Sequence, residues 1–318
     1  MKGALVTRYG SPDAILIADV PKPVPGPGEI LVRVYATSVS RTDTGELAGS
    51  VFLRPLYGRR SIFGMDVAGV VEEVGQGVTR FQLGDRIFGM CPFRRNGAQA
   101  EYVCLRESAS IATLPASIPF QQAALCEGAF YASAMIVKLA VGPGKRVLVF
   151  GASGAIGSAA VQLAKVEGAE VTAAVESRHL ELAHSLGADH VVDSSSEDFA
   201  KLGRRFDVVY DSVGKMPIRQ WRRLLKPAGM FATTDVGPNG QNLLAWFGAG
   251  IVRSKRVQIP LPPRASATPF VERLRDLMVD GRFRAVVDRT YALDDIADAY
   301  RYVKTGKKAG IVVVRVAE

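Results

Sequence analysis

Hydrophobic and polar positions follow different patterns in the two halves of the 318-residue chain. Before residue 120, short apolar runs such as 30–34 and 67–74 are separated by glycine and proline, which is typical of a β-rich domain. From residue 119 to 139 the chain is rich in alanine, which predicts a helix, and afterwards strand-like and helix-like segments alternate. The pattern therefore predicts a β-rich domain followed by an α/β domain.

The alternating region predicts a parallel sheet. Its apolar segments have few polar interruptions, which is expected of strands that helices cover on both faces. We predict strands at 146–150, 170–175, 191–192, 207–211 and 230–234, and helices at 155–167, 179–186 and 221–225. The apolar stretch 242–252 favours a core helix or a dimer contact over a cap on the substrate, and 257–260 predicts an edge strand. The tail predicts helices at 269–280 and 294–303 and strands at 286–287 and 311–316.

A glycine-rich turn connects the first predicted strand of this region to its helix. A turn between strand and helix is the context in which such glycines bind a dinucleotide. Gly154 lets the backbone approach a pyrophosphate, Gly157 lets the helix pack closely, and Ala152 stands where the usual motif has its first glycine. The predicted cofactor-binding residues of the turn are Gly151, Ala152, Ser153, Gly154, Ala155, Ile156 and Gly157.

Residues at the ends of later strands are expected to complete the cofactor site. Glu176, followed by Ser177, lies where an acidic residue usually binds the ribose hydroxyls, which favours NAD. Arg178 could instead bind a 2′-phosphate and favours NADP, so the choice between NAD and NADP stays open. Because ligands bind at the carboxyl ends of parallel strands, we assign the ribose and nicotinamide to Val213, Gly214, Val236 and Gly237.

Composition excludes several other classes of protein. The net charge is +9, but lysine and arginine are spread along the chain, so no nucleic-acid surface is expected. No apolar run is long enough for a transmembrane helix, and the first residues do not resemble a signal peptide. The three cysteines are far apart, which argues against a disulfide framework and favours the cytoplasm.

Several segments together resemble the medium-chain dehydrogenase/reductase superfamily, in its zinc-free quinone oxidoreductase-like branch. These segments are 23–32, 38–43, 64–71, 84–89, 97–102, 185–189 and 207–214. The resemblance implies a GroES-like catalytic domain, discontinuous in sequence, and a Rossmann domain. We place the GroES-like domain at 1–122, the Rossmann domain at 123–261 and the segment that completes the catalytic domain at 262–318.

The resemblance also bears on zinc. Zinc-containing relatives have a cysteine where this chain has Ser40 and a histidine where it has Met65, and serine and methionine are poor zinc ligands. Near the third ligand position the sequence reads Leu125-Cys126-Glu127, and Cys126 alone cannot hold the ion. We therefore expect no metal. Without a Lewis acid, reduction of a quinone or an α,β-unsaturated carbonyl is favoured, because hydrogen bonds can stabilise its conjugated oxygen.

The resemblance suggests the residues that work on the substrate. Thr42 stands where zinc-containing relatives have a hydroxyl relay, and it could bind the substrate oxygen or the nicotinamide ribose. Asp43 and Tyr131 are the other catalytic candidates, although Asp43 could equally be a turn or cap residue and Tyr131 a packing residue. Ser40 and Arg41 are assigned to the cofactor. The proton donor is left open, with solvent as one source.

These observations favour an NAD(P)H-dependent oxidoreductase that transfers a hydride to a small-molecule quinone or enone. One alternative is a zinc-free alcohol or aldehyde oxidoreductase. Another is a non-catalytic NAD(P)H-binding sensor, because Ser40 replaces the asparagine that is common in this branch. The edge strand at 257–260 further predicts a homodimer.

Overall fold

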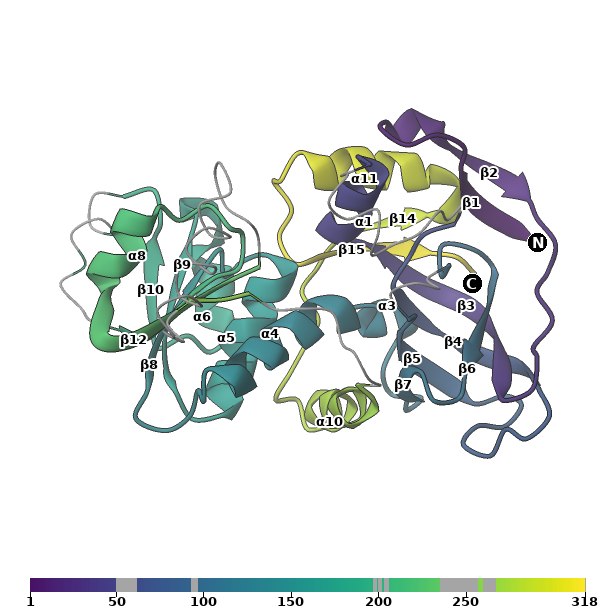
Figure 1. The fold of residues 1–318 in the computed structure, drawn as a ribbon, viewed down its shortest axis with the longest axis horizontal. Coiled ribbons are helices and arrows are strands. Elements are labelled where there is room, and N and C mark those ends of the chain that lie inside the picture. Colours follow the sequence, from purple (N-terminus) through teal and green to yellow (C-terminus); the bar gives the residue numbers. More distant parts are fainter. Residues whose placement is uncertain are drawn as a thin grey trace. The chain divides into compact units, whose positions relative to one another are not determined.

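The computed structural model describes residues 1–49, 62–92, 97–196, 199, 202, 206–234, 257–259 and 267–317 (Figure 1). The chain divides into two compact units. Unit 1 comprises Met1–Glu127 and Pro262–Glu318, and unit 2 comprises Gly128–Leu261. The boundaries predicted from the sequence lie after residues 122 and 261. The stretch 242–252 and the cofactor candidates Val236 and Gly237 lie outside the described residues.

Unit 1 is built around a 7-stranded sheet in the order β14-β15-β3-β4-β5-β7, with β6 also paired to β3. Its strands are β3 (Glu29–Val39), β4 (Asp66–Val74), β5 (Arg86–Met90), β6 (Tyr102–Arg106), β7 (Ser110–Thr113), β14 (Val287–Ala292) and β15 (Ile311–Arg315). A separate antiparallel pair consists of β1 (Lys2–Val6) and β2 (Ile15–Asp19). The strand predicted at 30–34 extends to Val39, because the polar residues Thr37 and Ser38 are buried and hydrogen-bonded to Asp66.

The carboxyl-terminal segment completes this sheet. β15 pairs antiparallel with β3, with Val312 opposite Val39, and Figure 1 shows the two strands side by side. Helix α10 (Thr268–Val279) contacts β7, and the Thr268 hydroxyl donates a hydrogen bond of 3.0 Å to the Ala109 carbonyl. Helix α11 (Ile296–Lys304) contacts α1 (Arg41–Leu47). The tail is therefore part of the same folding unit as the first residues of the chain.

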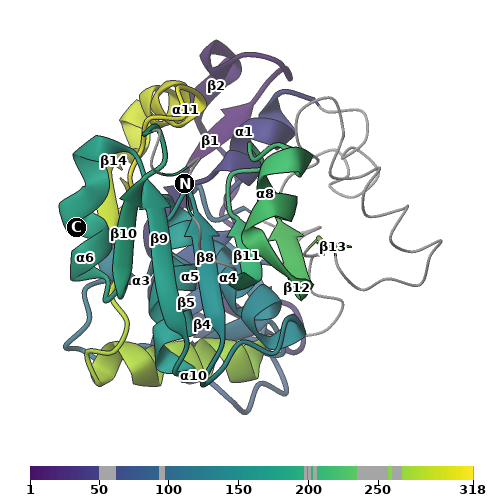
Figure 2. The ribbon, with the colours of Figure 1, turned by 90° about the vertical axis from the view of Figure 1, so that its left-hand side faces the viewer.

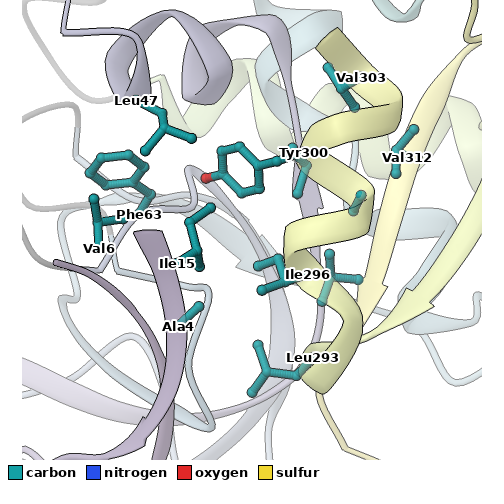
Figure 3. Packing of buried hydrophobic residues seen from close by; sticks show 13 residues of the cluster. Ala4, Val6, Ile15, Leu47, Phe63, Leu293, Ile296, Tyr300, Val303 and Val312 are labelled. Atoms are coloured by element: carbon teal, nitrogen blue, oxygen red, sulfur yellow. The ribbon is translucent and has the colours of Figure 1, made fainter. Parts of the chain in front are cut away.

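A hydrophobic cluster joins α1, α11 and the amino-terminal strands (Figure 3). Tyr300 reaches from α11 toward Leu47 and Phe63, and its side chain is fully buried. Its hydroxyl donates a hydrogen bond of 2.8 Å to Gln99 Oε1, which satisfies the polar atom inside the apolar cluster. This packing fixes α1, whose first turn carries Ser40 and Thr42.

Unit 2 contains a parallel sheet in the order β10-β9-β8-β11-β12-β13 (Figure 2). Its strands are β8 (Arg146–Phe150), β9 (Glu170–Val175), β10 (His190–Asp193), β11 (Phe206–Asp211), β12 (Leu225–Thr233) and β13 (Val257–Gln258). Its helices are α5 (Ala155–Val166), α6 (Leu180–Ser185) and α8 (Ile218–Leu224), together with most of α4 (Cys126–Lys138). The chain order runs outward from β8 in one direction and then from β11 in the other. The strand order therefore reverses between β8 and β11, which is where ligands bind in sheets of this kind.

The prediction of one continuous helix at 119–139 is wrong, because the structure divides this segment into two helices, α3 (Phe120–Ala123) and α4. Ala124, which ends α3, has a ψ of 60° and is not helical. The amide of Glu127 in the first turn of α4 donates a hydrogen bond of 2.7 Å to Asp66 Oδ1. A carboxylate on β4 thus caps the new helix, and this contact between distant residues is invisible in the local pattern.

Candidate functional site

The turn at residues 151–157, called the glycine turn below, begins with a residue in the left-handed region. Gly151 has a φ of +76°, and a Cβ atom there would lie 2.6 Å from Val213 Cγ1. The turn therefore requires glycine at Gly151. The sequence analysis instead aligned Ala152 with the first glycine of the usual motif. Ala152 is fully buried beneath the turn.

The two later glycines of the turn serve different purposes. A Cβ atom on Gly157 would lie 2.2 Å from the Gly151 carbonyl oxygen, so only glycine allows α5 to approach β8 this closely. A Cβ atom on Gly154 would meet nothing nearer than 3.5 Å, which leaves space beside the turn. Gly154 is the N-cap of α5, and no side chain caps this end of the helix.

These features fit a phosphate group of a dinucleotide. The first amides of α5 point out of an uncapped helix end with a partial positive charge, which stabilises an anion. Ser153, Ala155 and Ile156 are half-buried, so the turn is accessible to a ligand. The geometry agrees with the roles predicted for Gly154 and Gly157, while the binding itself is taken up below as a proposal.

The loop after β11 is fixed against the glycine turn by Asp211 and Ser212. Asp211 is buried and accepts hydrogen bonds from the amides of Val213 (3.1 Å), Gly214 (2.8 Å) and Met216 (2.8 Å). Burial raises the pKa of Asp211, and these backbone hydrogen bonds oppose the rise. The Ser212 hydroxyl donates to the Phe150 carbonyl at 2.8 Å. Asp211 thus positions the predicted cofactor residues Val213 and Gly214, and the sequence analysis did not assign it this role.

The residues after β9 are exposed and carry both charges. Arg178 Nη2 lies 2.7 Å from Glu176 Oε2, and both side chains are at least half exposed, at 50% and 62%. The Ser177 hydroxyl donates a hydrogen bond to Asp193. The pair keeps both Glu176 and Arg178 at the end of β9, so the geometry leaves the choice between NAD and NADP open.

In unit 1 the first turn of α1 is held by a capping box. The Ser40 hydroxyl accepts a hydrogen bond from the Asp43 amide (3.1 Å), and Asp43 Oδ2 accepts one from the Ser40 amide (2.7 Å). In this arrangement Asp43 acts as a helix-capping residue, which is the structural alternative to a catalytic role that the sequence analysis gave for it. Its catalytic assignment and the cofactor assignment of Ser40 stay predictions. Thr42 in the same turn is half-buried, and Arg41 is exposed.

Three buried carboxyl groups meet behind this turn: Asp43, Asp66 and Glu127, called the carboxyl cluster below. Each is at most 4% exposed. Asp66 accepts a hydrogen bond of 2.6 Å from the Ser38 hydroxyl in addition to that from the Glu127 amide. Burial raises the pKa of Asp66 to about 6, which these hydrogen bonds partly oppose. The sequence analysis assigned no function to Asp66.

Glu127 is another member of the cluster to which the sequence analysis assigned no function. Burial, together with the negative charges of Asp43 and Asp66, raises the pKa of Glu127 to about 8, and hydrogen bonds from the Thr42 and Ser40 hydroxyls oppose part of this rise. The sequence signal was an acidic residue inside an alanine-rich, mostly apolar predicted helix. Charged residues are rarely buried without a partner, so that signal could have marked it.

Lys308, which follows α11, is a further residue that the sequence analysis missed. Burial lowers the pKa of Lys308 to about 8, the nearby carboxylates of Asp288 and Glu127 raise it, and Arg41 lowers it. Its ammonium donates a hydrogen bond to the Gly310 carbonyl. Lys308 therefore brings a positive charge within electrostatic reach of Glu127.

Tyr131 lies on α4 in unit 2, at a half-buried position. Its backbone carbonyl accepts a long hydrogen bond of 3.4 Å from the Tyr210 hydroxyl, and its ring meets the Phe130 ring edge-on with centroids 5.8 Å apart. These contacts describe packing, and its catalytic role stays a prediction. Among the described residues, no three histidine, cysteine, aspartate or glutamate side chains are placed so that they could hold a metal ion.

A β-rich unit and a parallel-sheet unit with this glycine turn define the fold class of two-domain dehydrogenases. The family model for the alcohol dehydrogenase GroES-like domain matches residues 26–117, and that for zinc-binding dehydrogenase matches residues 186–314. The chain belongs to the medium-chain dehydrogenase/reductase superfamily, in its quinone oxidoreductase-like branch. The predicted combination of GroES-like and Rossmann domains is thereby confirmed.

Named relatives illustrate this placement. The chain is 31% identical over 326 residues to 2-methylene-furan-3-one reductase of Solanum lycopersicum, covering 99% of this chain and 79% of the relative. It is 30% identical over 307 residues to the chloroplast envelope quinone oxidoreductase homolog of Arabidopsis thaliana, covering 93% and 92%. The structure of the quinone oxidoreductase from Coxiella burnetii shares the fold with a TM-score of 0.88 at 24% identity, covering 100% of this chain and 99% of that one.

Proposed function

We propose that the protein is an NAD(P)H-dependent oxidoreductase that reduces a quinone or an α,β-unsaturated carbonyl without zinc. The observation that carries the proposal is the glycine turn, because an uncapped helix end and a Gly154 with space beside it lie where the strand order reverses. Relatives named as quinone oxidoreductases and enone reductases support the same reaction class. The nicotinamide cofactor would supply the hydride when it is bound.

The residues of unit 2 would hold that cofactor. The amides of the glycine turn would bind the pyrophosphate, and the exposed Glu176 and Arg178 would contact the adenosine ribose. The loop fixed by Asp211 would present Val213 and Gly214 to the rest of the cofactor.

The donor chemistry of unit 1 supports a reaction without zinc. Ser40 uses its hydroxyl to cap α1, and Met65 offers a thioether that is 4% exposed. Neither is a good zinc ligand. In place of a metal, Thr42 would donate a hydrogen bond to the substrate oxygen, on which negative charge develops as the hydride arrives.

The first experiment is to titrate the protein with NADH and NADPH and then to measure oxidation of the cofactor that binds, with a panel of quinones and enones. We expect saturable turnover of at least one member of the panel. Oxidation of alcohols without any quinone or enone reduction would favour the alcohol oxidoreductase instead. Tight binding with no consumption on any substrate would favour the sensor.

Two further predictions concern the cellular location and the oligomeric state of the protein. The described residues include no helix that is long and apolar enough to span a membrane. We propose a cytoplasmic location and a homodimer that pairs through the edge strand β13 (Val257–Gln258). Light scattering on the purified chain tests the dimer, since a mass matching a single chain contradicts it.

A further inference from the structure

Asp193, the last residue of β10, lies beside the carboxyl end of β9. The two strands pair in parallel with Asp193 opposite Val175, and Figure 2 shows them side by side. The Ser194 amide donates a hydrogen bond of 2.8 Å to the Val175 carbonyl. On the other side of β9, the Gly151 amide donates one of 3.0 Å to the Ala174 carbonyl. Asp193 therefore lies at the same edge of the sheet as the glycine turn.

Both carboxylate oxygens of Asp193 accept hydrogen bonds. The Ser177 hydroxyl donates to Oδ2, and the amide and hydroxyl of Ser195 donate to Oδ1 at 2.8 Å and 2.6 Å. These hydrogen bonds lower the pKa of Asp193 below its ordinary value, so the group is ionised at neutral pH. An ionised carboxylate accepts hydrogen bonds and donates none. The single proton of the Ser177 hydroxyl is therefore used in the bond to Asp193.

This bond decides what Ser177 can offer to a ligand. The side chain is exposed, and because its proton is directed to Asp193, its oxygen can accept a further hydrogen bond but cannot donate one. The 2′-hydroxyl of the ribose in NADH can donate to such an oxygen. The 2′-phosphate of NADPH presents acceptor oxygens and needs donors. Ser177 is thus suited to a ribose hydroxyl and unsuited to a phosphate.

The charges at the ends of β9 and β10 act in the same direction. Glu176 and Asp193 carry two negative charges against the single positive charge of Arg178, which lies 2.7 Å from Glu176. The three side chains together therefore carry one net negative charge. A 2′-phosphate would add a charge of about −1.5 to −2 at this place, whereas a ribose hydroxyl adds none. Arg178 alone would favour NADPH, and the Asp193 carboxylate opposes it.

We infer, on the basis of the proposed function, that Asp193 determines the cofactor specificity of this protein and makes NADH the preferred cofactor. It is a positioning residue, which acts through the orientation of the Ser177 hydroxyl and through its own charge. Once that charge is removed, the Ser177 hydroxyl can turn and donate to a 2′-phosphate beside Arg178. The preference for NADH is therefore expected to depend on one carboxylate that the sequence motif of the glycine turn does not include.

The test compares the binding of NADH and NADPH to the full-length wild type and to Asp193→Asn by fluorescence titration. We expect the wild type to bind NADH at least about tenfold more tightly than NADPH. Asp193→Asn keeps the shape of the side chain and should tighten NADPH binding about tenfold, while NADH binding changes less than about twofold. A wild type that prefers NADPH would overturn the inference. An Asp193→Asn variant that binds NADH normally and NADPH no better than the wild type would overturn it as well.

Asp189→Asn is the matched control, because it removes the same charge at the other end of β10. Asp189 accepts hydrogen bonds of 2.7 Å from the Val171 amide and from the Lys165 ammonium. The variant should leave the ratio of the two dissociation constants unchanged. A shift as large as that of Asp193→Asn would show that net charge, and not the place of Asp193, sets the preference.

Ser177→Ala separates the hydrogen bond from the charge. In the wild type it should weaken NADH binding about threefold, because the ribose loses an acceptor, and leave NADPH binding nearly unchanged. In Asp193→Asn the same substitution should remove part of the gain in NADPH binding, because the hydroxyl is then a donor to the phosphate. Retention of the whole gain would contradict the role assigned to Ser177.

Binding of adenosine fragments locates the effect at the ribose without any turnover. AMP and its 2′-phosphorylated form differ only in the phosphate, and calorimetry measures both. The wild type should bind AMP more tightly, and Asp193→Asn should reduce this difference; an unchanged difference would overturn the inference. A protein that reduces quinones or enones with NADPH in preference to NADH keeps the proposed function and loses this inference. If neither cofactor binds, the proposed function fails and the inference with it.

Discussion

The glycine turn of unit 2 and the carboxyl cluster of unit 1 are built on different principles. The turn relies on backbone atoms, and side chains are absent where the ligand would lie: Gly154 has open space, and Gly157 allows a 2.2 Å approach that no Cβ tolerates. The cluster relies on side chains from α1, β4 and α4, and burial together with neighbouring negative charge raises the pKa values of two of them, Asp66 and Glu127. A site that binds through its backbone is visible in a short motif, whereas a site made by burial depends on the whole fold.

We expect that adding a single methyl group at Gly157 disrupts the glycine turn. Gly157→Ala places a Cβ atom 2.2 Å from the Gly151 carbonyl oxygen, so β8 and α5 must separate. We expect a loss of about 1–3 kcal/mol in the free energy of unfolding. Binding of NADH or NADPH, measured by fluorescence titration, should weaken by at least about tenfold.

Gly142→Ala is the matched control, because its Cβ atom would meet nothing nearer than 3.9 Å, at the Glu167 carbonyl oxygen. It should bind the cofactor as the wild type does. Unchanged binding in Gly157→Ala would show that the cofactor does not depend on this turn.

The carboxyl cluster should reveal itself in the pH dependence of stability. The pKa of Glu127 is about 8 and that of Asp66 about 6 in the folded protein, both above their ordinary values of 4.5 and 3.8. The folded state therefore holds protons that the unfolded state releases, and stability falls as pH rises from about 4 to about 8. Urea unfolding at a series of pH values should show a fall on the order of a few kcal/mol.

Glu127→Gln should flatten part of this fall and be more stable than the wild type above pH 8, since no buried charge forms. Glu181→Gln, which alters an exposed carboxylate of unit 2, should leave the fall unchanged. A wild type whose stability does not change over this range would contradict the assigned protonation of the cluster.

The smallest expected effect concerns cofactor preference. Because Arg178 is paired with Glu176 but half exposed, it can turn to bind a 2′-phosphate at little cost. Arg178→Ala should weaken NADPH binding by about tenfold and leave NADH binding nearly unchanged. Arg222→Ala, at an exposed position on α8, should affect neither. Equal losses for both cofactors would remove Arg178 from the ribose site.

Elements of the fold and the site that depend on local sequence were predictable, whereas those that depend on distant residues were not. The strands 146–150 and 170–175 agree with β8 and β9 because apolar runs between turns encode buried parallel strands directly. The glycine turn could be read because its context is local. The break before α4 could not, since it depends on Asp66, 61 residues away in sequence. Glu127 and Lys308 could not be predicted for the same reason, because only the folded chain brings Glu127 close to Thr42 and Lys308 within electrostatic reach of Glu127.

The central claim is that this chain reduces a conjugated carbonyl with a nicotinamide cofactor and its own side chains, without a metal. The most direct test is steady-state reduction of a quinone or enone by protein that has been treated with a strong chelator, with its zinc content measured by mass spectrometry. The account predicts turnover equal to that of untreated protein, with far less than one zinc per chain. Loss of turnover on chelation, with recovery on adding zinc, would contradict it.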